Sequence, residues 1–175
     1  MKKVVSPENV AHLWANKIQD EARTSNGNLY FNNDKIYSYG YHFCIAMHSI
    51  GIDGNRGTLF TTRSYSNTTA KHISTVRSAA NHLNLIYCPY PAGDKYENLE
   101  YWIKEAEQIG LKLAKAKKPE LYLTQLDQLR DKVERYSNFI GFDYKELKSE
   151  LAALLAVSNK DEFAKYAEIK EAAIK

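Results

Sequence analysis

The sequence predicts an α+β fold in two regions. Residues 1–95 form an α+β domain, and residues 96–175 form a helical region that packs on it or makes a small bundle. In the first region, short apolar and aromatic runs alternate with Gly, Asn and Asp, which predicts a small, mainly antiparallel sheet. Two segments before residue 84 have helical spacing and flank this sheet. Beyond Gly93, apolar residues keep the helical spacing nearly to the end.

The first helix is predicted to begin at Ser6-Pro7-Glu8. Ser can accept a hydrogen bond from a free amide group, Pro fits the first turn, and Glu favours the positive end of the helix dipole. The apolar residues that share one face of this helix are Val10, Leu13, Trp14 and Ile18. The turn-forming residues 24–28 are expected to end it.

A hairpin is predicted next, with strands at residues 29–31 and 35–37. Residues 32–34 are Asn, Asn and Asp, which tolerate the left-handed conformations of tight turns. We expect the second strand to continue to Met47. Side chains of a strand alternate between faces, so Tyr39, Phe43 and Ile45 should be buried together, and His42 should lie on the opposite face.

The tyrosines of that strand allow a second interpretation. Tyr37, Tyr39 and Tyr41 share one face, and a row of aromatic rings can stack with nucleic-acid bases. The same face continues with Phe43 and apolar residues, which favours a core position instead.

The remaining elements follow from turn residues and periodicity. Residues 51–57 contain three Gly and lead into a short strand at residues 58–62. A helix is predicted from Thr68 to Leu83, followed by a strand at residues 85–88 and a boundary in residues 90–96. In the tail, four apolar stripes predict helices separated near Pro119, Gly141 and Ser158-Asn159.

Composition restricts the class of protein. Cys44 and Cys88 allow one disulfide at most, and the start MKKVVSPENV lacks the apolar stretch of a signal peptide. No apolar run approaches the roughly 20 residues that cross a bilayer. We therefore expect a soluble, cytoplasmic protein with free thiols and no membrane association. Residues 1–96 hold 10 Lys and Arg against 6 Asp and Glu, whereas residues 97–175 hold 14 against 15, so the positive excess lies in the first part.

The main functional candidate is the segment from Arg63 to Arg77, with Ser78 next to it. A helix N-terminus has unbonded amide groups and a partial positive charge, which attract phosphate. Here hydroxyl groups surround the helix start, and no Asp or Glu occurs between residues 63 and 93. The predicted nucleic-acid or phosphate-binding residues are Arg63, Ser66, Thr68, Thr69, Lys71, Ser74, Arg77 and Ser78. Alternatively, Ser66 or Asn67 caps the helix and the other residues form a solvated face.

Histidines give a weaker signal. His42 and His72 are a secondary polar candidate. No CxxC, HxxxH or HExxH spacing occurs, and six residues of strand would place His42 and His48 about 20 Å apart. We expect no metal. The glycines of residues 51–57 match neither the Walker pattern nor GxGxxG, so no nucleotide cofactor is expected.

Two stretches carry a resemblance to a known family. Residues 37–43 read YSYGYHF, and residues 60–72 read FTTRSYSNTTAKH. Together with the hairpin before them, they resemble a family of bacteriophage and mobile-element proteins that has no established activity. The resemblance covers roughly residues 10–90 and leaves the helical tail outside. It implies action in the host cytosol on nucleic acid or on host nucleoprotein machinery, including defence systems.

Three functional hypotheses follow. The first is a non-enzymatic phage or mobile-element protein that binds nucleic acid or a host nucleoprotein complex through Arg63, Lys71 and Arg77. The second is an inhibitor of a host defence complex, similar to an anti-CRISPR protein, that contacts a host protein through its C-terminal helices. The third is an enzyme on a phosphate-bearing substrate, with His42 or His72 as general base.

Overall fold

A computed structural model of the chain describes residues 2–39, 43–64 and 66–174. The chain divides into two compact units, Met1–Asp94 and Lys95–Lys175. The first combines a six-stranded, mainly antiparallel sheet with two helices, and the second is built from five helices in the part that is described. The predicted α+β fold with a helical C-terminal part is confirmed.

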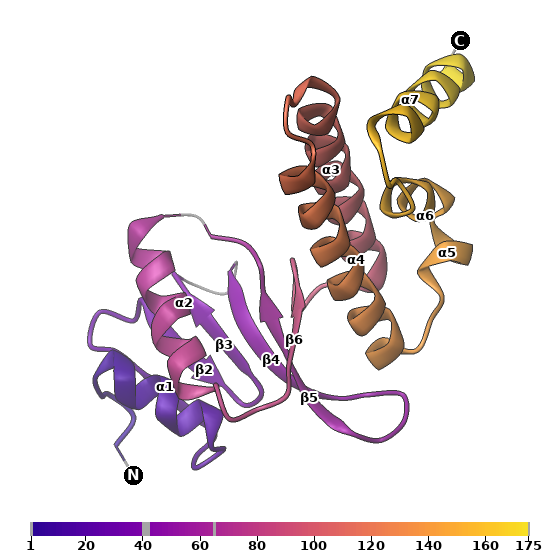
Figure 1. Cartoon of the computed structure of the whole chain (residues 1–175). Coiled ribbons are helices and arrows are strands. Elements are labelled where there is room, and N and C mark those ends of the chain that lie inside the picture. The colour runs from indigo at the N-terminus through magenta and orange to yellow at the C-terminus, as the bar shows by residue number, and fades with distance from the viewer. Residues whose placement is uncertain (1, 40–42, 65, 175) are drawn as a thin grey trace. The chain divides into compact units, whose positions relative to one another are not determined.

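The strands of the first unit pair in the order in which they occur along the chain (Figure 1). They are β1 (Glu21–Arg23), β2 (Leu29–Asn32), β3 (Lys35–Ser38), β4 (Cys44–Ile50), β5 (Arg56–Thr61) and β6 (Leu85–Cys88). Neighbours from β1 to β5 are antiparallel. After the crossover helix α2 (Asn67–Ala79), β6 runs parallel to β5. Asn33, with φ 55°, makes the tight turn between β2 and β3 that the sequence predicts.

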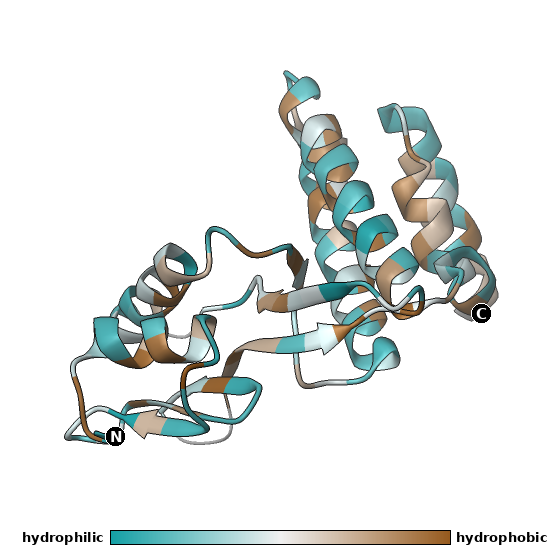
Figure 2. Cartoon of the chain, turned by 90° about the horizontal axis from the view of Figure 1, so that it is seen from below, coloured by the Kyte–Doolittle hydropathy of each residue, from teal (hydrophilic) through white to brown (hydrophobic). Residues whose placement is uncertain are grey.

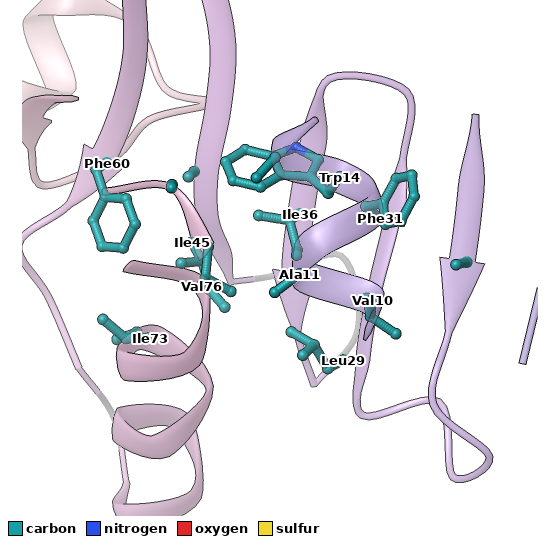
Figure 3. Packing of buried hydrophobic residues seen from close by; sticks show 14 of the residues in the cluster. Val10, Ala11, Trp14, Leu29, Phe31, Ile36, Ile45, Phe60, Ile73 and Val76 are labelled. Carbon is teal, nitrogen blue, oxygen red and sulfur yellow. The ribbon is translucent and has the colours of Figure 1, made fainter. Parts of the chain in front are cut away.

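Helices α1 (Pro7–Ala15) and α2 contact each other and pack against the sheet through one shared core. Figure 3 shows this core, with Trp14 from α1 and Val76 from α2 among side chains of the strands. Trp14 is 1% exposed, and its indole Nε1 donates a hydrogen bond to the Asp34 carbonyl at 2.8 Å. The core therefore fixes the position of α2, whose opposite face carries the predicted site.

The first helix is shorter than predicted. It begins at Pro7 with Ser6 as its N-cap, as expected, but it ends at Ala15, and Ile18 is 46% exposed. The strand β1 that follows was missed, because three residues are too few to show an alternating pattern. Only Ala22 of this strand is buried, where it pairs with Phe31 of β2.

The prediction of one strand from Tyr37 to Met47 is wrong. β3 ends at Ser38, and Tyr39 has φ 54°, which turns the chain out of the strand. Tyr39 is consequently 47% exposed, contrary to prediction. Phe43 and Ile45 are buried as predicted. Gly40, Tyr41 and His42 lie outside the described residues.

The register of β4 explains the broken alternation. Its pairing with β3 shifts between Ile36 and Tyr37, so the consecutive residues Ile45 and Ala46 both belong to the core. Cys44 is 7% exposed and Cys88 is fully buried, and neither forms a disulfide. Burial raises the pKa of Cys44 to about 12 and also raises the pKa of Cys88. Both thiols are therefore protonated and unreactive.

The second unit contains α3 (Lys95–Lys115), α4 (Glu120–Ile140), α5 (Tyr144–Leu147), α6 (Ser149–Leu155) and α7 (Lys160–Ile174). Hydrophobic and hydrophilic residues are interspersed along these helices (Figure 2), and α3 and α4 bury apolar residues at helical spacing. Gly110 allows a close approach between α3 and α7, because a Cβ there would collide with the Phe163 ring. The helical character predicted for this region is confirmed.

Candidate nucleic-acid interface on helix α2

The start of α2 is held by an N-cap. Ser66 has extended backbone angles, and its Oγ accepts a hydrogen bond from the Thr69 amide at 3.2 Å. The same hydroxyl donates to Thr69 Oγ1, also at 3.2 Å, and Thr69 is only 2% exposed. Ser66 and Thr69, both predicted as site residues, therefore stabilise the helix start. Thr68, between them in sequence, is exposed.

The outer face of α2 is polar and exposed. Lys71, Ser74, Arg77 and Ser78 all lie on the solvent side, whereas Ile73 and Val76 are buried in the core. The Arg77 guanidinium carbon lies 5.2 Å from the centroid of the Phe60 ring. Because Phe60 is fully buried, Arg77 also covers the core at this point. The structure thus brings four of the eight predicted residues onto one accessible helix face, which carries no carboxylate.

Arg63 packs against the residue that precedes β4 and against the segment that follows β6. Its Nε donates to the Pro89 carbonyl at 3.0 Å, and its guanidinium carbon lies 3.9 Å from the centroid of the Tyr90 ring. The Phe43 ring is 5.2 Å away from the same carbon. Pro89 also accepts a hydrogen bond from the Thr61 hydroxyl. Arg63 therefore ties the end of β5 to the segment after β6, a role that the sequence does not reveal.

His72 is the part of the secondary polar candidate that the structure describes. Its Nδ1 lies 2.7 Å from the hydroxyl of Ser38, which is fully buried. Burial lowers the pKa of His72, so the ring is neutral at pH 7. The ring lines a hollow of about 440 Å³ with Ser6, Thr24 and Asn26. The predicted partner His42 lies outside the described residues.

The hollow at His72 has little support as a catalytic site. Ser38 is inaccessible as a nucleophile because it is fully buried. No carboxylate lines the hollow to orient the imidazole. In the described parts of the chain, no group of three His, Cys, Asp or Glu side chains could hold a metal ion.

The structure brings together a second group of basic residues that the sequence does not indicate. Lys17, Arg56 and His82 line a hollow of about 270 Å³ near the ends of α1 and α2. Because the three residues lie in separate segments, no local sequence pattern could have indicated that they meet.

The second unit has a hollow of a different character. It measures about 580 Å³ between α6 and α7, and Ala153, Ala156 and Ile169 contribute to its mostly apolar lining. Ile169 is 71% exposed. At its rim, Lys170 pairs with Glu107 and approaches Glu150 to 3.7 Å.

Two further findings concern the chain as a whole. Across the described ranges, no helix is long and apolar enough to cross a membrane. Comparison with protein-family models, with curated proteins and with solved structures finds no match to this chain.

Proposed function

We propose that the Met1–Asp94 unit binds nucleic acid through the outer face of α2, without catalysing a reaction. One observation carries this proposal: Lys71, Ser74, Arg77 and Ser78 are all exposed on a helix that contains no carboxylate. Lys and Arg supply charge to phosphate groups, and Ser hydroxyls supply directed hydrogen bonds. Such contacts position a protein on nucleic acid with little dependence on base sequence.

The length of the face suits a phosphate backbone. At 1.5 Å per residue, Lys71 and Ser78 are separated by about 10 Å along the helix axis. Several phosphates of one strand can therefore contact the face together. A role on nucleic acid or on a host nucleoprotein complex is also what the sequence resemblance of residues 10–90 implies.

The test compares two double variants that remove the same charge. Lys71→Gln/Arg77→Gln removes the cations of the α2 face, and Lys104→Gln/Lys145→Gln removes two exposed cations of the second unit. Binding to a labelled oligonucleotide duplex and to a single strand is measured by fluorescence anisotropy at several salt concentrations. If each contact contributes about 1.5–3 kcal/mol, the first variant should bind at least about tenfold more weakly, whereas the control should bind as wild type.

Salt dependence gives a second measurement in the same experiment. Each lost phosphate contact should lower the slope of log affinity against log salt by about 0.9 for a duplex. If wild type shows no binding even at low salt, the nucleic-acid proposal is wrong. Equal affinity of wild type and the α2 variant would likewise exclude α2 as the interface.

A second candidate function is inhibition of a host defence complex through protein contacts of the helical unit. The mostly apolar hollow between α6 and α7, with the exposed Ile169, favours this candidate. Its binding should change little with salt, and Ile169→Asp should abolish it. Capture of host proteins with and without nuclease treatment distinguishes it from binding through nucleic acid.

A further inference from the structure

The hollow of about 270 Å³ near the ends of α1 and α2 has the features of an anion site. Lys17 follows α1, Arg56 begins β5, and His82 follows α2. Asn16, Ser49 and Asn84 add polar groups to the lining, and His48 and Thr58 are buried polar members of it. Basic side chains from three separate segments therefore open onto one small space.

These basic side chains lack a carboxylate partner among the described residues. Lys17, Arg56 and His82 are all exposed, and none of them forms an ion pair with a residue in the described ranges. No Asp or Glu lines the hollow. Like charges that share a small space repel one another, and a bound anion would remove that repulsion.

Lys17 occupies a backbone position that favours glycine. Its φ is 52°, its amide donates to the Trp14 carbonyl at 3.2 Å, and the next amide, Ile18, donates to the Leu13 carbonyl at 3.0 Å. This pattern is the Schellman motif, in which the left-handed residue is usually Gly. A lysine at this position is less favourable for the backbone than glycine.

The floor of the hollow is neutral and fixed. His48 is 7% exposed, stacks on Trp14 at 4.2 Å between ring centroids, and donates from Nε2 to the Trp14 carbonyl at 3.0 Å. Its Nδ1 then accepts from the Thr58 hydroxyl at 3.1 Å. Burial lowers the pKa of His48, the hydrogen bond to the Trp14 carbonyl opposes this shift, and the charge of Lys17 acts in the same direction as burial. The Asp34 carboxylate also acts on this ring, in the opposite direction, but it does not line the hollow.

We infer that this hollow binds a phosphate group through Lys17, Arg56 and His82. The guanidinium of Arg56 can hold two phosphate oxygens, and the ammonium of Lys17 supplies a second charge. The phosphate can belong to a small phosphorylated molecule or to a nucleic-acid backbone. The second source rests on the proposed function: the α2 face runs from Lys71 through Ser78 towards His82, so a strand bound on α2 would reach the hollow.

The first experiment uses inorganic phosphate as the probe. Wild type is titrated with it at constant ionic strength, and the amide signals of Lys17, Gly57 and Asn84 are followed by NMR. These signals should shift and saturate, and Lys17→Gln/Arg56→Gln should abolish the response while Lys104→Gln/Lys145→Gln preserves it. Shifts that are absent, or that persist in the Lys17/Arg56 variant, would overturn the inference.

Lys17→Gly separates a binding role from a structural one. Glycine suits the left-handed position, so this variant should have a higher thermal midpoint than wild type. Its response to inorganic phosphate should nevertheless fall severalfold. A variant that is stabilised and still binds phosphate as wild type would show that Lys17 has no part in a phosphate site.

Oligonucleotide binding by the same Lys17/Arg56 variant identifies the source of the phosphate. Weaker binding with a lower salt slope assigns the hollow to a backbone phosphate. Unchanged oligonucleotide binding, together with loss of the inorganic phosphate response, assigns it to a small phosphorylated molecule. The two proposals can fail separately. If the protein binds inorganic phosphate but no oligonucleotide, the phosphate site is supported and the α2 interface is rejected. If inorganic phosphate causes no response but the Lys71/Arg77 variant binds oligonucleotide more weakly than wild type, the α2 interface is supported and the phosphate site is rejected.

Discussion

At the start of α2, polar side chains bond to one another and to the backbone, whereas beyond its end the basic side chains face an open hollow. Ser66 and Thr69 cap the helix, and Arg63 contacts Pro89 and two aromatic rings. Lys17 and Arg56 form no ion pair within the described part of the chain. The difference separates polar residues that stabilise the fold from those that remain available to a ligand.

The largest effect is expected for His48, which can be compared with His82 because both line the same hollow. His48→Ala removes the stacking on Trp14 and leaves the Trp14 carbonyl and the Thr58 hydroxyl without their partner. We expect the free energy of unfolding to fall by about 3 kcal/mol. His82→Ala, at an exposed position, should change it by less than about 0.5 kcal/mol. Urea denaturation measures both, and equal losses would contradict the distinction.

Arg63 and Lys71 provide the next comparison. Arg63→Ala removes the hydrogen bond to Pro89 and the contacts with Tyr90 and Phe43, so we expect a loss of about 1–2 kcal/mol. Lys71→Ala should be nearly neutral for stability. Thermal unfolding followed by circular dichroism tests both variants. If Arg63→Ala does not change the stability, Arg63 is again a candidate for contact with a ligand.

The N-cap of α2 should contribute about 1 kcal/mol to the free energy of unfolding. Ser66→Ala removes the acceptor for the Thr69 amide and should lower the stability by roughly that amount. Ser66→Asp, which keeps an acceptor, should restore it. Thr68→Ala, two positions along the chain and exposed, serves as the control and should stay within about 0.5 kcal/mol of wild type. Equal losses in Ser66→Ala and Thr68→Ala would show that the cap is not what stabilises the helix start.

The smallest expected effect is the change of stability with pH. Burial lowers the pKa of both His48 and His72 in the folded state, so the unfolded chain binds protons more readily than the folded one below their ordinary pKa. The free energy of unfolding should therefore have its full value at pH 7.5 and should decrease as the pH falls below about 6.5. Denaturation at several pH values measures this decrease, and His72→Gln should make it smaller. A wild-type stability that rises towards pH 5 would contradict the assigned directions.

Much of the fold followed from local sequence. The helix start at Ser6-Pro7, the turn at Asn33 and the helical tail were predicted because caps, turns and periodicity act over a few residues. The predictions that failed concern features that depend on contacts with distant segments or on a rare backbone angle. Three-residue β1 exists through its pairing with β2 and the bridge from Arg23 to Val4, and β3 ends at Ser38, before Tyr39, which has a backbone angle that tyrosine rarely adopts.

The candidate site was predictable only in part. Helical periodicity correctly placed Lys71, Ser74 and Ser78 on one exposed face. It could not show that Thr69 is buried or that Arg63 binds the Pro89 carbonyl, because both depend on contacts with other segments. The hollow at Lys17 is the clearest example, since its three basic residues come from three different segments.

The strand order has a consequence for how the chain acquires its structure. Each strand of the sheet pairs with the strand that precedes it in sequence, so most pairings close short loops. Short loops lose little chain entropy on closing, and folds dominated by such contacts form quickly. During synthesis, each strand finds its partner already outside the ribosome. The first unit can therefore fold while the helical unit is still being translated.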